Sequence, residues 1–244
     1  MDYHRDFYEG YAQTAMGKLH YLHHDGQGKS IVFMHGLGAS SLVWQKLVAF
    51  LPDAMDVYLL DLLGHGDSDK PRIKYNIGVQ VNALKEFVSS FTEPPYLFGH
   101  SYGGWIAARY ASIVKGIPGI ILEDPAGLKQ YFLDIQNNVG EERYKEKMLK
   151  NLLSINGNER YVMESILDED TDKSGWLDET LLSRIACKCL ILWGSSDKVI
   201  DIRYAGILNS AIAGSKMEIV DGANHEPHYT NPDKVADIIA SFTR

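Results

Sequence analysis

Short apolar runs rich in β-branched residues recur along the chain, and the segments between them carry apolar residues at helical spacing. We expect the strands to be residues 31–36, 57–61, 96–100, 119–124, 189–194 and 216–220. We expect the helices to be residues 40–50, 76–91, 103–114, 201–212 and 232–243. This alternation predicts an α/β fold, in which a mostly parallel sheet is covered by helices on both faces.

Two further stretches precede the first of these strands and alternate polar with apolar residues. EGYAQTA and KLHYLHH lie on either side of Met16 and Gly17. This pattern predicts an antiparallel hairpin at one edge of the sheet. The sheet should therefore have about eight strands.

One long segment, residues 127–186, does not continue the alternation. It has no strand pattern, but it contains helical stretches such as EERYKEKMLKNLL and NERYVMESIL. We expect residues 127–186 to form a helical cap, inserted into a core domain made of residues 1–126 and 187–244.

Composition narrows the classes of partner. The 244 residues are 45% hydrophobic, which suits one globular domain with an insertion. The net charge is −8 and no basic run occurs, so nucleic acid and anionic membranes are poor partners. The sequence shows no secretory signal and no stretch of apolar residues long enough to span a membrane. The only cysteines, Cys187 and Cys189, are expected to be free thiols in the core. We therefore expect a cytoplasmic protein, with no indication of its oligomeric state.

The stretch FGHSYGG, residues 98–104, places Ser101 between Gly99 and Gly103 directly after an expected strand. A one-residue turn from strand to helix forces a positive φ, and glycines on either side prevent collisions with the neighbouring backbone. The Ser101 hydroxyl would then project at the carboxyl edge of the sheet, where α/β proteins bind ligands. A phosphate loop is the weaker interpretation, since neither G-x-x-x-x-G-K-S/T nor G-x-G-x-x-G occurs.

A serine becomes a nucleophile when an imidazole takes its proton and a carboxylate orients that imidazole. His225, in the loop after the last strand, is the leading base, and His228 is the alternative. Asp197, after the preceding strand, is the leading acid. Glu123 and Asp124 end another strand at the same edge and could supply the carboxylate instead.

The glycine-rich turn HGLGAS, residues 35–40, follows the strand that should neighbour the serine strand. Its backbone N–H at Leu37, together with the N–H of Tyr102, could hold the oxyanion of a tetrahedral intermediate.

These motifs together resemble those of the α/β-hydrolase superfamily. The matching stretches are HGLG (35–38), DLLGHGDS (61–68), GHSYGG (99–104), GSSD (194–197) and GANHEPHYTNPDKV (222–235). The resemblance implies that Ser101 is the nucleophile, His225 the general base and Asp197 its orienting acid, with Leu37 and Tyr102 as oxyanion donors. It also implies that the loop with Asp61, Gly64, Gly66 and Ser68 is structural and that His65 belongs to the scaffold.

The substrate class follows less directly. In the cap, Tyr131, Phe132, Tyr144, Met148 and Trp176 could form an apolar roof over a small molecule with an acyl group. A carboxylic ester or a lactone fits best. The resemblance also includes carbon–carbon bond hydrolases, cofactor-free haloperoxidases, lyases and non-catalytic ligand receptors, although Glu226 after His225 weakens the first of these. No metal or organic cofactor is expected.

Overall fold

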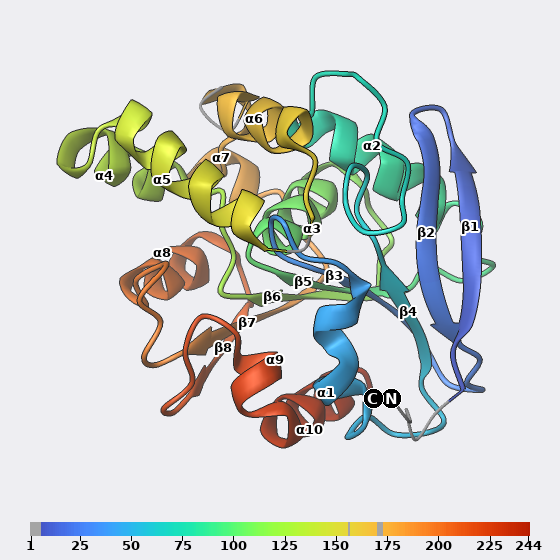
Figure 1. The fold of residues 1–244 in the computed structure, drawn as a ribbon. Coiled ribbons are helices and arrows are strands. Elements are labelled where there is room, and N and C mark those ends of the chain that lie inside the picture. Colours follow the sequence, from blue (N-terminus) through green and yellow to red (C-terminus); the bar gives the residue numbers. More distant parts are fainter. Residues whose placement is uncertain (1–5, 156, 170–172) are drawn as a thin grey trace.

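The computed structural model describes residues 6–155, 157–169 and 173–244, and its framework is a single eight-stranded sheet (Figure 1). The strands follow the order β1-β2-β4-β3-β5-β6-β7-β8. Their bounds are β1 Tyr8–Thr14, β2 Gly17–His24, β3 Ser30–Met34, β4 Asp56–Leu60, β5 Tyr96–His100, β6 Gly119–Glu123, β7 Lys188–Gly194 and β8 Lys216–Val220. Strands β4, β3, β5, β6, β7 and β8 pair in parallel. The predicted mostly parallel sheet is confirmed.

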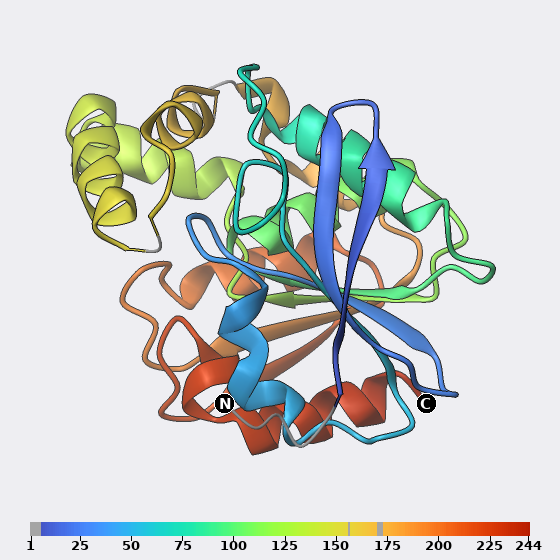
Figure 2. The same ribbon diagram turned by 45° about the vertical axis from the view of Figure 1, so that its right-hand side comes forward.

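The predicted hairpin is also confirmed. Strands β1 and β2 pair antiparallel around the turn at Met16, and β2 pairs antiparallel with β4. The hairpin extends past the other strands and lies beside α2, Ile77–Val88 (Figure 2). At its far end His23 stacks on Tyr58 with ring centroids 4.0 Å apart, and its Nε2 contacts Asp56 Oδ1 at 2.7 Å. His23 is therefore part of the packing against β4.

Helices lie on both faces because the buried strand residues alternate between two cores. One core contains Val32, Leu97 and Ile120 of the sheet and packs against α2 and α3, Tyr102–Ile113. The other contains Phe33, Phe98 and Ile121 and packs against α1, Gln45–Val48, and α10, Pro232–Phe242. Figure 1 shows α1 and α10 on the side of the sheet opposite α2 and α3. The bounds of the other core helices are α8 Arg203–Ala211 and α9 Pro227–Thr230.

Two helical details differ from the sequence prediction. The helix expected at residues 40–50 is a 3-10 turn, η1 (Ser41–Trp44), followed by the single turn α1. Ser41 N donates to the buried carboxylate Oδ1 of Asp61 at 2.5 Å, which fixes the start of this segment. The short helix α9 was not predicted, because one turn shows no hydrophobic period.

The segment between β6 and β7 is helical, as expected. Its elements are α4 Lys129–Asn138, α5 Glu141–Ser154, α6 Arg160–Glu169, the 3-10 turn η2 Lys173–Gly175 and α7 Glu179–Leu182. Contacts attach it to the turn after β3 and to the start of α3: Asn158 Nδ2 donates to Gly38 O at 2.8 Å, and Trp105 Nε1 donates to Gly175 O at 3.0 Å. Its helices therefore lie over the side of the sheet where Ser101 is found. Whether residues 127–186 form a separate cap domain stays a prediction.

Candidate active site

Ser101 occupies the turn between β5 and α3. Its backbone has φ 49° and ψ −109°, a left-handed conformation that residues other than glycine rarely adopt. The turn is held on both sides: Ser101 N donates to Glu123 O at 2.9 Å, and Ser101 O accepts from Trp105 N and Ala126 N, each at 3.0 Å. The strained backbone conformation of Ser101 is therefore held by hydrogen bonds to β6, to the loop after it and to the first turn of α3.

The two glycines beside Ser101 are required by close backbone contacts. A Cβ atom on Gly99 would overlap the carbonyl oxygen of Gly103, and one on Gly103 would overlap that of Met34. The lack of side-chain bulk around Ser101 therefore lets α3 pass directly over β5 and β3.

His225 and Asp197 lie together, as predicted. Asp197 follows β7 and His225 follows β8, and the His225 Nδ1–H donates to Asp197 Oδ2 at 2.7 Å. The other Asp197 oxygen, Oδ1, accepts from Val199 N at 2.7 Å and Ile200 N at 3.0 Å. Burial alone would raise the pKa of Asp197, but the hydrogen bond and charge of His225 and these two N–H groups outweigh it and lower the pKa. Asp197 is thus an ionised hydrogen-bond acceptor for the imidazole.

His100, the residue before Ser101, contacts His225. His100 is buried, its Nε2–H donates to the backbone oxygen of His225 at 2.8 Å, and the two rings have centroids 4.9 Å apart. Burial, with the neighbouring His228 and His225, lowers the pKa of His100 well below its usual value, so it is a neutral donor. Among the described residues, no hydrogen bond joins Ser101 Oγ to the His225 ring.

The turn with Leu37 lies next to Ser101. Gly103 N donates to His35 O at 3.2 Å, and a Cβ atom on Gly36 would come 3.4 Å from the Ser101 Cβ. Tyr102 begins α3, where the helix dipole is positive. Both expected oxyanion donors are therefore in segments that flank Ser101.

The alternative residues have other partners. His228 is 1% exposed, and it binds Glu123 twice: His228 N donates to Oε1 at 2.9 Å and Nδ1 to Oε2 at 2.5 Å. This pair lies behind the site and holds the chain that follows His225. Asp124 is fully buried, and its Oδ1 accepts from Gly194 N at 3.0 Å.

In the loop with Asp61, the Asp61 carboxylate accepts hydrogen bonds from several parts of the chain. Asp61 is 1% exposed and accepts from Ser41 N, from Asp67 N at 2.9 Å and from His20 Nδ1 at 2.8 Å. His65, in the same loop, is fully buried, and burial lowers its pKa to about 3. These contacts support a scaffold role for this loop.

The five expected roof residues divide into two groups. Phe132 and Trp176 are 5% and 3% exposed and stack with centroids 5.1 Å apart, with Trp105 beside Phe132. Tyr131, Tyr144 and Met148 are half-buried. The first pair anchors the helical segment to α3, while the other three keep accessible surface.

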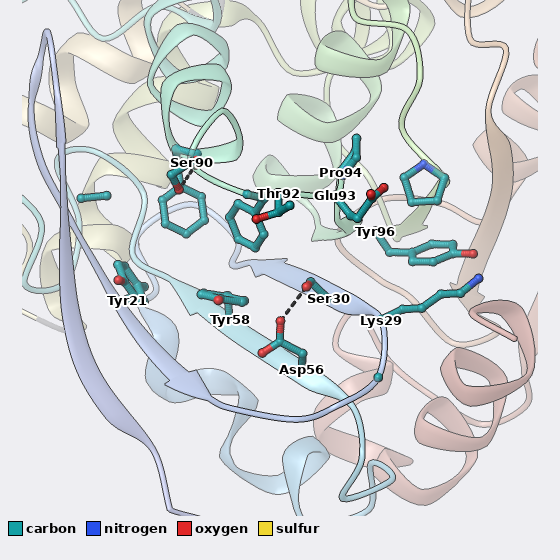
Figure 3. Close-up of a pocket in the computed structure, with 15 residues that line it drawn as sticks. Tyr21, Lys29, Ser30, Asp56, Tyr58, Ser90, Thr92, Glu93, Pro94 and Tyr96 are labelled. Carbon is teal, nitrogen blue, oxygen red and sulfur yellow. Dashed lines mark hydrogen bonds between the residues drawn. The ribbon is translucent and has the colours of Figure 1, made fainter.

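A cavity of about 680 Å³ lies at the opposite edge of the sheet (Figure 3). Its lining includes Ser30, Asp56 and Tyr96, which begin β3, β4 and β5. Because Tyr96 and Ser101 are five residues apart on an extended strand, they are separated by roughly 16 Å. This cavity therefore does not receive a substrate of Ser101.

Two groups of side chains at the site contain atoms of the kind that bind metal ions, and within each group two of the side chains hydrogen-bond to each other. Potential ligand atoms of His100, Glu123 and His228, and of Asp124, Asp197 and His225, come within 4.8 Å of one another. In each group an imidazole donates directly to a carboxylate.

In the part of the chain that the structure describes, no helix has the length and apolar character needed to cross a membrane.

Known proteins resemble this chain over most of its length. Residues 31–238 match the model of the alpha/beta hydrolase family. An uncharacterized protein of Mycobacterium bovis is 28% identical over 89% of this chain and 76% of its own length. The human monoacylglycerol lipase ABHD6 is 23% identical over 98% of this chain and 86% of its own.

Solved structures agree on the architecture. The enol-lactonase from Burkholderia xenovorans LB400 superposes with a TM-score of 0.76 at 20% identity, covering 96% of this chain and 99% of the lactonase. At this identity the likeness concerns the fold. The family model, however, spans most of the sequence, from β3 to α10. This chain is therefore a member of the alpha/beta hydrolase family.

Proposed function

We propose that this protein is a serine hydrolase that cleaves carboxylic esters or lactones, with Ser101 as nucleophile, His225 as general base and Asp197 as orienting acid. The observation that carries the proposal is the 2.7 Å hydrogen bond from His225 Nδ1 to Asp197 Oδ2, at the sheet edge where the strained turn presents Ser101. It leaves Nε2 of His225 as the proton acceptor.

The reaction would proceed in two steps. Ser101 Oγ attacks the acyl carbon while His225 takes the hydroxyl proton, and the backbone N–H groups of Leu37 and Tyr102 stabilise the oxyanion. His225 then protonates the leaving alkoxide, which departs and leaves an acyl group on Ser101. Water, deprotonated by the same imidazole, then attacks this acyl group. The bond from Ser101 Oγ to the acyl carbon breaks, His225 returns the proton to Oγ, and the carboxylic acid is released.

Relatives support the substrate class. A monoacylglycerol lipase and an enol-lactonase, by their names, act on an ester and on a lactone, and both extend over nearly the whole chain. We propose that residues 127–186 cap the site and that the half-buried Tyr131, Tyr144 and Met148 contact the acyl group. Phe132 and Trp176 would shape the roof through packing. A cytoplasmic location is proposed because Cys187 and Cys189 are free thiols.

The first test is a series of nitrophenyl esters of graded acyl length, combined with a fluorophosphonate probe and mass spectrometry. We expect ester turnover and an adduct on Ser101. Ser101→Ala should lower kcat at least about 1,000-fold, because no other group supplies the nucleophile. Ser112→Ala, at the far end of α3, is the matched control and should keep full activity.

Other outcomes separate the alternatives. Turnover that survives in Ser101→Ala would place the chemistry elsewhere. Absence of both turnover and adduct would favour a ligand receptor with this fold. Adding lactones and a vinylogous diketone ranks the substrate classes, since preference for the diketone would favour a carbon–carbon bond hydrolase.

A further inference from the structure

A second carboxyl group, Asp124, lies buried beside the Asp197–His225 pair. Asp124 follows β6 in a left-handed conformation, φ 42°, and its side chain is inaccessible to solvent. Its backbone and its side chain are both tied to β7: Asp124 N donates to Leu192 O at 3.0 Å, and Gly194 N donates to Asp124 Oδ1 at 3.0 Å. The position of the carboxyl group is therefore fixed by the end of β7, the strand that leads to Asp197.

The second oxygen, Asp124 Oδ2, is buried and has no hydrogen-bond donor to accept from among the described residues. One oxygen of Asp124, one of Asp197 and a ring nitrogen of His225 all lie within 4.8 Å of one another. Asp197 Oδ1 already accepts from two backbone N–H groups, and Oδ2 accepts from His225. A carboxylate at Asp124 would thus face another carboxylate with nothing between them, whereas a carboxylic acid could donate to it.

The charged groups around Asp124 favour the protonated form. Burial comes first, and the negative charges of Glu123 and Asp197 add to it, so that the pKa of Asp124 is raised to about 11. The imidazoles packed around the same site are those of His225, His228 and the neutral His100. His225 Nδ1 donates to Asp197 and His228 Nδ1 to Glu123, so neither of these ring N–H groups is donated to Asp124.

We propose that Asp124 is a neutral carboxylic acid that donates a hydrogen bond from Oδ2 to Asp197 and acts as a positioning residue for the Asp197–His225 pair. Its effect on catalysis rests on the function proposed above. The donated bond holds the Asp197 carboxylate in place and draws off part of its negative charge. Asp124 therefore limits how strongly Asp197 stabilises the imidazolium form of His225.

The pH profile of kcat/KM for ester hydrolysis tests this role in two variants. Asp124→Gly removes the donor and tolerates the left-handed backbone. Because Asp197 then keeps its full charge, His225 is protonated more readily, and the acid limb should move to higher pH by roughly half a unit or more. Asp124→Asn keeps both an amide donor and an acceptor for Gly194, so it should leave the acid limb close to that of the wild type.

The sign of the shift is decisive. If Asp124 were ionised, removing its charge would make His225 harder to protonate, and both variants would move the acid limb to lower pH. If Asp124 were merely structural, Asp124→Gly would lower activity without moving the limb. Either result overturns the proposal. Asp201→Asn, an exposed carboxylate in the same loop as Asp197, is the control for loss of one negative charge and should not shift the profile.

A readout independent of turnover separates this proposal from the proposed function. The infrared spectrum of the wild type at pH about 8 should contain the carbonyl stretching band of a protonated carboxylic acid, which Asp124→Asn and Asp124→Gly should lose. If the band is present but no ester is cleaved, the protonated pair stands and the hydrolase function fails. If esters are cleaved but the band is absent, or survives in Asp124→Asn, the proposal for Asp124 is wrong.

Discussion

At the scale of single residues, the site combines groups whose chain positions are far apart. Glu123 and His228 are separated by 105 residues and are 0% and 1% exposed, yet they form two hydrogen bonds. Removing one partner of such a pair leaves the other polar group buried without compensation. The contact anchors α9, the one-turn helix that follows the loop with His225. It therefore also fixes the path of that loop between β8 and α9.

Glu123→Ala should therefore lower the free energy of unfolding by about 3–5 kcal/mol. Urea denaturation measures this change. Glu218→Ala, an exposed glutamate in the edge strand β8, is the control and should change stability by less than about 0.5 kcal/mol. Equal stability of Glu123→Ala and the wild type would show that the pair is not needed to hold the loop with His225.

The sequence was enough to propose Ser101, Asp197 and His225 as candidates, because each is in a short local motif after an expected strand. It also placed Glu123 and Asp124 at the right sheet edge. It did not reveal that Glu123 pairs with His228, or that a carboxyl oxygen of Asp124 lies within 4.8 Å of one of Asp197. These pairings depend on the register of β5, β6 and β7 and on burial, which a local pattern does not encode. The structural role of His100 was missed for the same reason.

At the scale of elements, the helical segment after β6 contacts the turn that follows β3. Asn158, between α5 and α6, donates from Nδ2 to Gly38 O at 2.8 Å and to Leu152 O at 3.0 Å. Gly38 has φ 75° and belongs to the turn that contains Leu37. The side chain thus joins the proposed cap to the proposed oxyanion turn.

Asn158→Ala should reduce kcat for ester hydrolysis by roughly 3- to 10-fold, because a lost hydrogen bond of about 1 kcal/mol loosens the turn that positions the Leu37 N–H. Steady-state kinetics on the nitrophenyl esters measures it. Asn138→Ala, an exposed asparagine at the end of α4, is the matched control. A rise in KM with unchanged kcat would indicate that Asn158 serves substrate binding alone.

The strands were predicted within two residues because buried parallel strands are continuous apolar runs bounded by polar turns. The segment 40–50 and α9 were not, because a 3-10 turn and a one-turn helix are too short for helical periodicity. Tertiary bonds fix both: Asp61 holds the start of η1, and Glu123 holds the backbone N–H of His228 in α9.

At the scale of the whole molecule, three neutral histidines are buried in the core near the carboxyl edge. Burial lowers the pKa of His35 and of His100 from the usual 6.5, and lowers that of His65 to about 3. Below pH 6.5 the unfolded chain binds protons at these residues while the native protein does not. The neutral state of these histidines therefore contributes its full stabilisation above pH 6.5. This contribution is lost as the pH falls toward the pKa values that the histidines have in the folded protein.

We expect the urea midpoint to fall steadily below about pH 6.5, with each such histidine contributing up to about 1.4 kcal/mol per pH unit. His65→Asn cannot take up this proton, so its stability should depend less steeply on pH, whatever its absolute stability. His24→Asn, at a half-exposed position in β2, is the control. Parallel curves for His65→Asn and the wild type would contradict the neutral, buried state of His65.

The bond between Asn158 and Gly38 has one more consequence. A bulky ester that enters by displacing α5 and α6 must break this bond, and the turn with Leu37, the proposed oxyanion donor, then loses that support. The ester carbonyl would be polarised again only after the helices return over the bound substrate. Substrate entry and ester cleavage would then alternate. Small esters that enter without displacing the helices would be cleaved without this delay.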